Sequence, residues 1–180
     1  DSVRALEAVM DGYQVMTVLE ASPLGDIFIT ATGDFNVIDV SSIDRMKNGA
    51  ILANSGHFNV EINVPYMESI SKDKRQIRHS VEEYNVRDGR KLYLLGEGRL
   101  INLAAAEGHP SSVMDMSFAN QALSTEFLAN NAADMEKTVV PVPHDIDKEV
   151  GRMKLLAMGI DIDVLTPEQR EYLDSWEIGT

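Results

Sequence analysis

The chain has 180 residues, of which 44% are hydrophobic and 25% are charged, and its formal net charge is −13. A chain this acidic, with lysines and arginines scattered along it, is a poor match for a phosphate backbone or an anionic membrane, and no apolar run reaches the roughly 18 residues of a membrane span. We therefore expect no nucleic-acid partner and no membrane partner. The absence of cysteine excludes disulfides and thiolate metal sites, and it suits a reducing cytoplasm.

Apolar strands and short helices alternate over the first sixty residues. The patterns predict, in order, a helix over 3–10 ended by Gly12, a strand over 13–18, a strand over 26–31, a helix over 41–46 capped by Ser41 or Ser42, and a strand over 50–53. Near-continuous apolar strands separated by helices are typical of a parallel sheet buried on both faces. This segment is expected to form the later units of a doubly wound α/β fold.

The next segment combines a helix with a hairpin. Its predicted elements are a helix over 63–70 and two extended segments, 78–86 and 91–95, on either side of the turn Arg87-Asp88-Gly89-Arg90. Gly96-Glu97-Gly98 then follows a strand, as a phosphate-binding loop would. Ile101 occupies the place of a third glycine, however, and no crossover follows. We therefore do not interpret the glycine pair as a phosphate loop.

The C-terminal part is mainly helical. Its predicted elements are a long helix over 111–130, an extended segment with two prolines over 139–143, a helix over 146–157 ended by Gly159, a half-exposed strand over 160–164, and a last helix that begins at Thr166-Pro167-Glu168-Gln169. These last four residues form a capping box with proline at the first helical position.

Two turns lie where ligands of open α/β sheets bind, at the carboxyl ends of parallel strands. Thr32-Gly33 follows the strand over 26–31, and its small residues would let a dinucleotide approach the backbone; the alternative is an ordinary strand-to-helix turn. Ser55-Gly56-His57 follows the strand over 50–53, where a histidine can act as a general acid or base or bind a substrate hydroxyl. The alternative there is a histidine that caps the turn or faces solvent.

A third candidate region surrounds Gly108-His109-Pro110. Glycine frees the backbone before His109 and proline restricts it afterwards, so the three residues resemble a hinge that carries a functional group; the alternative is a plain break before the next helix. Asn102, a polar residue among aliphatic ones, indicates backbone close to a small-molecule ligand. Met114 and Phe118 would face the same cleft as His109, although such a pair is more often core. No histidine pair has metal-ligand spacing, so we expect no metal.

Four long segments resemble the S-adenosyl-L-homocysteine hydrolase family, in the family's own order. They are ALEAVMDGYQVM, LGDIFITATGDFNVI, MKNGAILANSGHFNVEI and LLGEGRLINLAAAEGHPSSVMDMSFANQAL. The resemblance covers essentially the whole chain. It implies the latter part of a Rossmann-type doubly wound parallel sheet, followed by helices that return to a substrate domain.

The resemblance also implies an organisation into domains. Residues 1–107 would be a partial NAD-binding domain, 108–110 a hinge, 111–165 a C-terminal contribution to the substrate domain, and 166–180 a C-terminal helix and tail. The chain would be the C-terminal part of a short, prokaryotic-type member, and inactive alone. Its parent would be a cytoplasmic homotetramer.

The family keeps NAD⁺ bound and hydrolyses S-adenosyl-L-homocysteine reversibly to adenosine and L-homocysteine. Oxidation of the ribose 3′-hydroxyl acidifies the 4′ proton, homocysteine leaves by elimination, water adds, and the ketone is reduced again. Such a cycle needs groups that manage protons and a site closed to water.

Carried over to this chain, the resemblance assigns most of the candidate residues to the cofactor. Asn102 would hydrogen-bond the nicotinamide carboxamide, and the two turns would lie along the dinucleotide and at its nicotinamide end. The cofactor-binding residues would be Thr32, Gly33, Ser55, Gly56, His57 and Asn102.

The remaining roles concern the substrate. His57 and His109 would be catalytic, and the residues that contact substrate would be His57, His109, Met114 and Phe118. The family's phosphate loop and its catalytic lysine and aspartate are not in this sequence. Glu107 stands where an apolar residue often lies against the base, so the inosine analogue of the substrate is an alternative.

Other departures and alternatives concern the cofactor and the activity. Arg4 replaces an asparagine and Ala31 a threonine that are common in relatives, which affects contacts to the adenosine half of NAD. A catalytically silent, partner-binding homologue is one further alternative. A 2-hydroxyacid dehydrogenase is another, since its NAD domain has comparable turns, but it does not account for Gly108-His109-Pro110 and the long helix after it.

Overall fold

The computed structural model describes residues 1–175. The chain divides into two compact units, Asp1–Gly108 and His109–Thr180, each with its own set of elements. The part of the predicted C-terminal tail beyond Ser175 lies outside the described residues.

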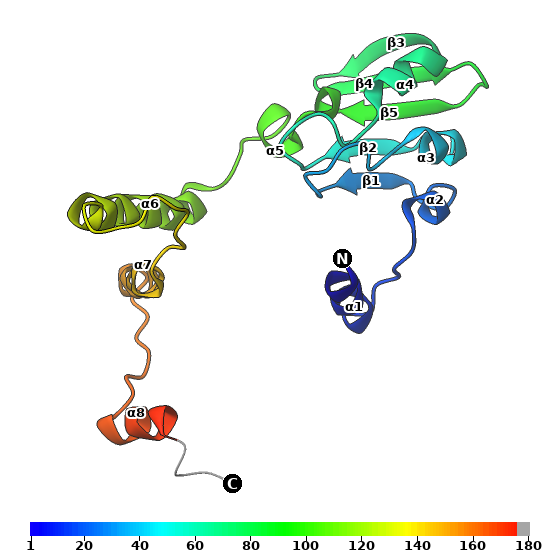
Figure 1. Cartoon of the computed structure of the whole chain (residues 1–180). Coiled ribbons are helices and arrows are strands. Elements are labelled where there is room, and N and C mark those ends of the chain that lie inside the picture. Colours follow the sequence, from blue (N-terminus) through cyan, green and yellow to red (C-terminus); the bar gives the residue numbers. More distant parts are fainter. Residues whose placement is uncertain (176–180) are drawn as a thin grey trace. The chain divides into compact units, whose positions relative to one another are not determined.

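The first unit is built on one mixed sheet of five strands, in the order β1-β2-β5-β4-β3 (Figure 1). The strands are β1 (Ile27–Thr30), β2 (Ile51–Asn54), β3 (Ser71–Arg78), β4 (Val81–Val86) and β5 (Lys91–Leu95). β1, β2 and β5 are parallel, whereas β4 and β3 continue the sheet antiparallel. The α/β class and the hairpin of β4 and β5 are confirmed, but the sheet is not wholly parallel.

Polar side chains begin the principal helices of this unit. The helices are α1 (Ser2–Met10), α2 (Val18–Ala21), α3 (Val40–Arg45), α4 (Val64–Ile70) and α5 (Ile101–Ala104), with a 3₁₀ turn η1 (Gly96–Gly98). Asn63 caps α4 by accepting from Tyr66 N–H at 3.0 Å. α3 is capped by Asp39, which accepts from Ser42 N–H at 2.9 Å, so the expected serine cap is wrong.

The strand expected over 13–18 is also wrong. Thr17 and Glu20 form a capping box, in which Thr17 N–H donates to the Glu20 carboxylate at 3.0 Å and Glu20 N–H donates to Thr17 Oγ1 at 3.2 Å. Because this box fixes the first turn of a helix, the chain enters α2 at Val18.

The core lies between one face of the sheet and helices α3 and α4. Its buried members are Ile38, Ile43, Met46, Ala50, Leu52, Ile62, Met67, Tyr84, Val86, Leu92 and Leu94. On the opposite face, Ile27 and Ile29 of β1 are 63% and 66% exposed. No element within residues 1–175 covers this face of β1.

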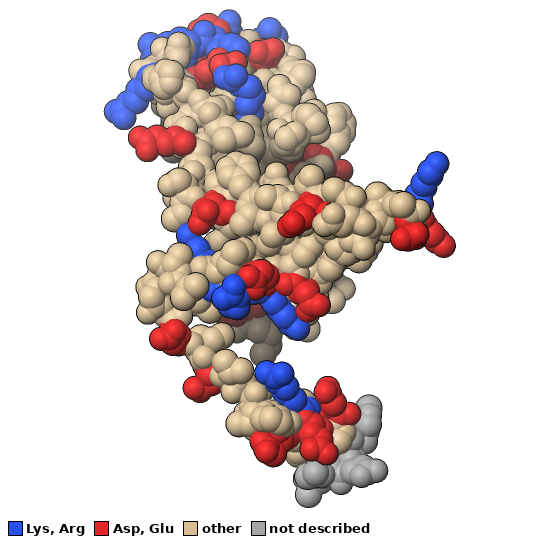
Figure 2. Space-filling model, turned by 90° about the vertical axis from the view of Figure 1, so that its left-hand side faces the viewer, with Lys and Arg blue, Asp and Glu red and all other residues tan. Residues whose placement is uncertain are grey.

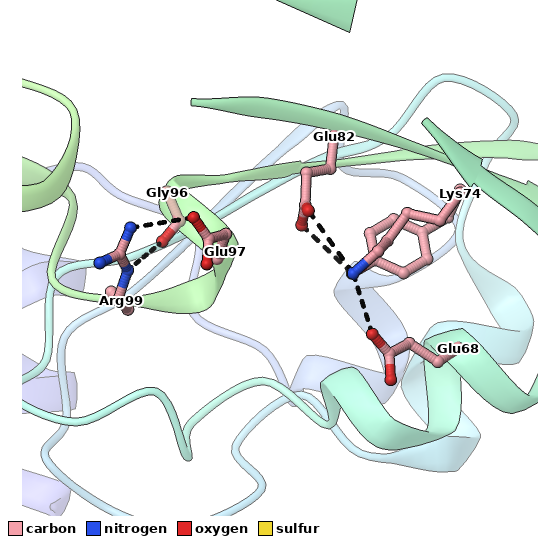
Figure 3. Close-up of polar contacts among 7 residues, drawn as sticks. Glu68, Lys74, Glu82, Gly96, Glu97 and Arg99 are labelled. Carbon is pink, nitrogen blue, oxygen red and sulfur yellow. Dashed lines mark hydrogen bonds and ion pairs between the residues drawn. The ribbon is translucent and has the colours of Figure 1, made fainter. Parts of the chain in front are cut away.

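β3 is a charged edge strand. It carries Lys72, Lys74, Arg75 and Arg78, so basic residues gather at this end of the sheet (Figure 2). Its pairing with β4 also has two register irregularities. Lys74 Nζ lies 3.0 Å from Glu68 Oε1, 3.5 Å from Glu82 Oε1 and 5.6 Å from the Tyr84 ring centroid, which joins α4 to the hairpin (Figure 3). Charges and bulges of this kind discourage edge-to-edge pairing.

A buried carboxylate holds the other face of the antiparallel strands together. Glu83 is 3% exposed, and it accepts hydrogen bonds from Arg75 Nε at 2.7 Å, Tyr93 Oη at 3.2 Å and Lys91 Nζ at 3.4 Å. The Arg75 guanidinium, supported by Tyr93 and Lys91, lowers the pKa of Glu83 below its ordinary value. Ionised Glu83 thus stabilises the packing of β3, β4 and β5.

The second unit is helical over its described residues. Its helices are α6 (Ser111–Asn131), α7 (His144–Ala157) and α8 (Pro167–Asp174). Lys154 Nζ on α7 lies 3.0 Å from Asp115 Oδ2 on α6. Gly159 ends α7 with φ +68°, and the predicted capping box of Thr166 and Gln169 begins α8. Residues 160–165 form no strand, since alternation alone gives the backbone no partner strand.

No helix within residues 1–175 combines the length and the apolar character that crossing a bilayer requires.

Glu83→Gln should destabilise the protein in a pH-dependent way. A carboxylate with a lowered pKa contributes stability above its ordinary pKa of 4.5 and loses that contribution as pH falls through the lower folded value. The variant should therefore unfold at lower urea concentration than wild type at pH 7, with the difference shrinking below pH 4.5. Exposed Glu126→Gln is the control, and an equal difference at pH 7 and pH 3 would contradict the assignment.

Candidate functional site

The loops after β1, β2 and β5 meet at the carboxyl ends of the parallel strands, and Asn54 joins them. Asn54 is fully buried. Its Oδ1 accepts from Thr30 Oγ1 at 3.2 Å and from Gly56 N–H at 2.6 Å, and its Nδ2 donates to the carbonyls of Phe58 at 2.7 Å and Gly98 at 2.8 Å. All the hydrogen-bonding atoms of this amide are used within the protein.

Glu61 makes a second connection, between the loops after β1 and β2. Its carboxylate is 0% exposed and accepts from Thr32 N–H at 3.0 Å, Thr32 Oγ1 at 2.8 Å and Gly33 N–H at 2.8 Å. The backbones of the two loops also pair, since Ile38 N–H donates to the Glu61 carbonyl at 2.9 Å. We refer to the hydrogen bonds of the Glu61 carboxylate with Thr32 and Gly33 as the Glu61 bridge.

The Glu61 carboxylate is ionised although it is buried. Burial by itself raises the pKa of Glu61, but the hydrogen bonds from Thr32 N–H, Gly33 N–H and the Thr32 hydroxyl outweigh it, and the pKa lies below its ordinary value. Glu61 has no ion-pair partner among residues 1–175, so these donors, with the hydroxyl of Thr30, stabilise its charge.

Gly56 packs directly against the side chains of both Asn54 and Glu61. A Cβ on Gly56 would collide with Glu61 Oε1 and would lie 3.0 Å from Asn54 Oδ1. The position therefore requires glycine for lack of space, and the glycine lets the turn after β2 lie directly on the buried carboxylate.

The Glu61 bridge changes what the first predicted turn can offer a ligand. The N–H groups of Thr32 and Gly33 donate to Glu61, so they are not available for a dinucleotide. Both residues are exposed and small, and the contact that they can make is close packing of the backbone. Ser55 N–H is likewise occupied, by the Thr30 carbonyl at 2.6 Å, while its side chain is exposed.

His57 opens onto a cavity of about 430 Å³. The cavity is lined by His57, Phe58, Asn59, Arg99, Leu100, Leu103 and Ala104. The rings of His57 and Phe58 meet edge to face, with centroids 4.4 Å apart. Arg99 hydrogen-bonds the Gly96 carbonyl at 3.3 Å and Glu97 Oε1 at 3.0 Å, which fixes it beside η1 (Figure 3). The wall is mainly apolar, with the imidazole of His57, the carboxamide of Asn59 and the guanidinium of Arg99 as its polar groups.

Asn102 lies on α5, one residue before the cavity-lining Leu103. Its Oδ1 is buried and finds no hydrogen-bond donor among residues 1–175. Its backbone carbonyl accepts from Gly108 N–H at 3.0 Å, which folds residues 103–108 back onto α5. A buried acceptor without a donor costs about 1–3 kcal/mol, so an arrangement of this kind fits a ligand that brings an N–H group.

The other predicted site residues belong to the second unit. His109 is exposed and precedes Pro110, which caps α6, and Gly108 before it has φ +81°. Met114 is half-buried and Phe118 is 59% exposed, one helical turn apart on α6. Neither side chain lines the crevice between α6 and α7. Among residues 1–175 there is no group of acidic or histidine side chains that could hold a metal ion.

Residues 1–108 match the family model for the NAD binding domain of S-adenosyl-L-homocysteine hydrolase. The chain belongs to this family. It is 58% identical over 180 residues to an adenosylhomocysteinase of Aquifex aeolicus (strain VF5), a match that covers 100% of this chain and 43% of that protein. Adenosylhomocysteinases of Sulfolobus acidocaldarius and Pyrobaculum aerophilum are each 57% identical, over 98% and 100% of the chain and 43% and 41% of their own lengths. The chain thus spans less than half the length of these relatives.

Family membership identifies NAD as the cofactor of the first unit, and the local chemistry fits it. Asn102 Oδ1 is buried without a donor among residues 1–175, and an amide N–H₂, as in a nicotinamide carboxamide, is a donor of the kind that it lacks. The predicted turns lie at the edge of the parallel strands where dinucleotides bind in such sheets.

Sequence reasoning missed Asn54 and Glu61. Each carried a signal, because Asn54 is a polar residue that ends the apolar run 50–53, and Glu61 is a charged residue between Val60 and Ile62. A polar residue in such a place must find buried partners, but Thr30 and Gly98 lie 24 and 44 residues from Asn54, and the partners of Glu61 lie 28 and 29 residues away, so they could not be read from spacing.

Gly56→Ala should destabilise the protein by about 1–3 kcal/mol, the usual cost of overpacking, because the new methyl displaces the Glu61 carboxylate. Gly151→Ala is the matched control, since that helical glycine has open space around it. The control should be neutral or stabilising by up to about 1 kcal/mol. Urea denaturation of both variants measures the difference, and equal effects would disprove the close approach at Gly56.

Proposed function

We propose that the protein containing this chain hydrolyses S-adenosyl-L-homocysteine reversibly to adenosine and L-homocysteine with bound NAD. The chain would supply the second half of the NAD-binding domain (1–107), the hinge at 108–110, and a return to the substrate domain over 111–165, followed by a C-terminal helix and tail over 166–180. The family match and the identity of 57–58% to adenosylhomocysteinases support the activity. A homotetrameric state and a cytoplasmic location remain predictions of the family resemblance.

The single observation that supports the place of the nicotinamide is the buried Oδ1 of Asn102, which lacks a donor among residues 1–175. We assign to Asn102 the nicotinamide carboxamide, and to Ser55, Gly56 and His57 the surface around the same ring. Thr32 and Gly33 would pack along the dinucleotide, because the Glu61 bridge already uses their amides.

His57 has the chemistry that the oxidation of a ribose hydroxyl needs. Its imidazole borders the cavity and can accept or return the hydroxyl proton, beside the apolar side chains of Leu100, Leu103 and Ala104. When bound, NAD accepts a hydride from the substrate and later returns it. His109 would act as the second proton-handling group, and Met114 and Phe118 would pack against the nucleoside.

The isolated 180-residue chain should be inactive. It spans 43% of its Aquifex relative, and the proposed reaction needs a phosphate loop and a main substrate domain that the sequence does not contain. Turnover of S-adenosyl-L-homocysteine by the isolated chain with added NAD would overturn this expectation. Exposed Glu107 suggests the inosine analogue as an alternative substrate. Parallel assays of the full-length protein with the adenosine and inosine compounds decide which nucleobase it accepts.

His57→Ala in the full-length protein should lower kcat by about 10²–10⁴-fold, the usual contribution of a general acid or base. His79→Ala is the control, because His79 is also exposed but lies next to β3, away from the cavity. Steady-state kinetics measure both. An unchanged rate for His57→Ala would remove His57 from the site.

Asn102→Ala in the full-length protein should weaken NAD binding by at least about tenfold, since a buried amide partner is lost. Isothermal titration of NAD into protein stripped of cofactor measures the effect, and exposed Asn130→Ala serves as the control. If NAD affinity is the same in all three proteins, the carboxamide assignment fails.

A further inference from the structure

Two buried glutamates of the first unit differ in how their charge is stabilised. Glu83 is held by the cationic groups of Arg75 and Lys91. Glu61 is more deeply buried, at 0% exposure, and is held only by hydroxyl and backbone N–H donors. Burying a carboxylate without a cation is expensive, so Glu61 is a costly way of stabilising a fold.

The position of Glu61 accounts for that cost. Its carboxylate fixes Thr32 and Gly33 from one side, and the turn at Gly56 packs on it so closely that a methyl group would not fit. The backbone bond from Ser55 N–H to the Thr30 carbonyl and the Asn54 side chain join the two loops at Thr30, but neither reaches Thr32 or Gly33. Glu61 is the side chain that holds the Thr32-Gly33 turn against the turn at Gly56.

We propose that Glu61 is a positioning residue for the cofactor, holding the Thr32-Gly33 turn and the Ser55-Gly56-His57 turn at the spacing that NAD requires. This inference rests on the proposed function. It assigns Glu61 no contact with substrate and no proton transfer. Glu61 acts through the backbone of the turns, as preorganisation of a binding site.

Two variants of Glu61, one isosteric and neutral and one charged but shorter, separate its charge from its size. In Glu61→Gln one of the two carboxylate oxygens is replaced by an N–H₂ group, which then faces the N–H of Thr32 or of Gly33. Two donors cannot bond to each other, so at least one hydrogen bond is lost. Glu61→Asp retains the charge on a side chain one methylene shorter, and it should restore part of the lost affinity. Glu83→Gln is the matched control, because it also neutralises a buried glutamate of the same sheet.

The experiment uses the full-length protein and two readouts that do not depend on activity. Calorimetric titration of NAD should show binding weakened at least about tenfold in Glu61→Gln, less in Glu61→Asp, and unchanged in Glu83→Gln. Hydrogen exchange of the peptide over 31–36 should become faster in Glu61→Gln, less so in Glu61→Asp, and stay unchanged in Glu83→Gln. Thermal denaturation shows whether each variant is folded. If Glu61→Gln does not fold, the comparison of Glu61→Asp with wild type is used in its place.

The possible failures are distinguishable. If Glu61→Gln binds NAD as wild type does, the positioning role is overturned while the proposed function stands. The same holds if Glu83→Gln loses as much affinity as Glu61→Gln, because the effect would then be general destabilisation. If the wild-type protein binds no NAD, the proposed function itself is wrong, and this inference with it.

Discussion

The hydrogen bonds of two buried side chains, Asn54 and Glu61, fix the irregular loops beyond the ends of the parallel strands. The amide of Asn54 joins the loops after β2 and β5, and the carboxylate of Glu61 joins those after β1 and β2. Because both groups are buried, removing either leaves several partners unsatisfied at once. The sheet provides the framework, but a few polar atoms determine the spacing of the loops and hence the shape of the site.

Much of the framework could be predicted because its signals are local. The strands at 27–30 and 51–54 are apolar runs, the capping box at Thr166 is a four-residue pattern, and Gly159 ends its helix in a left-handed conformation. β3 was largely missed because the sequence over 71–78 is almost entirely polar, and its side chains from Lys72 onward are exposed. β3 is a strand because it pairs with β4, and the sequence over 71–78 has no alternation of apolar and polar residues that would indicate this.

The candidate site was less predictable than the fold, for the same physical reason. Thr32, Gly56 and His57 could be found from their place after strands. The role of Glu61 could not, since its partners are 28 and 29 residues away in the sequence. The buried state of Asn102 Oδ1 likewise depends on packing around α5. Family resemblance suggests the roles proposed for Thr32, Gly56, His57 and Asn102, whereas the role proposed for Glu61 comes from the contacts of its carboxylate.

The two edges of the sheet differ in how they would meet a second copy of the chain. β3 carries charges and bulges, whereas β1 is a short apolar strand in regular register with β2 and with Ile27 and Ile29 exposed. An apolar edge without such protection is a template for strand addition. What opposes it is mutual repulsion between chains of charge −13, which acts over about 10 Å at 0.1 M salt. Any strand addition at β1 in the isolated chain should therefore become easier as ionic strength rises, because salt screens the repulsion between two such chains.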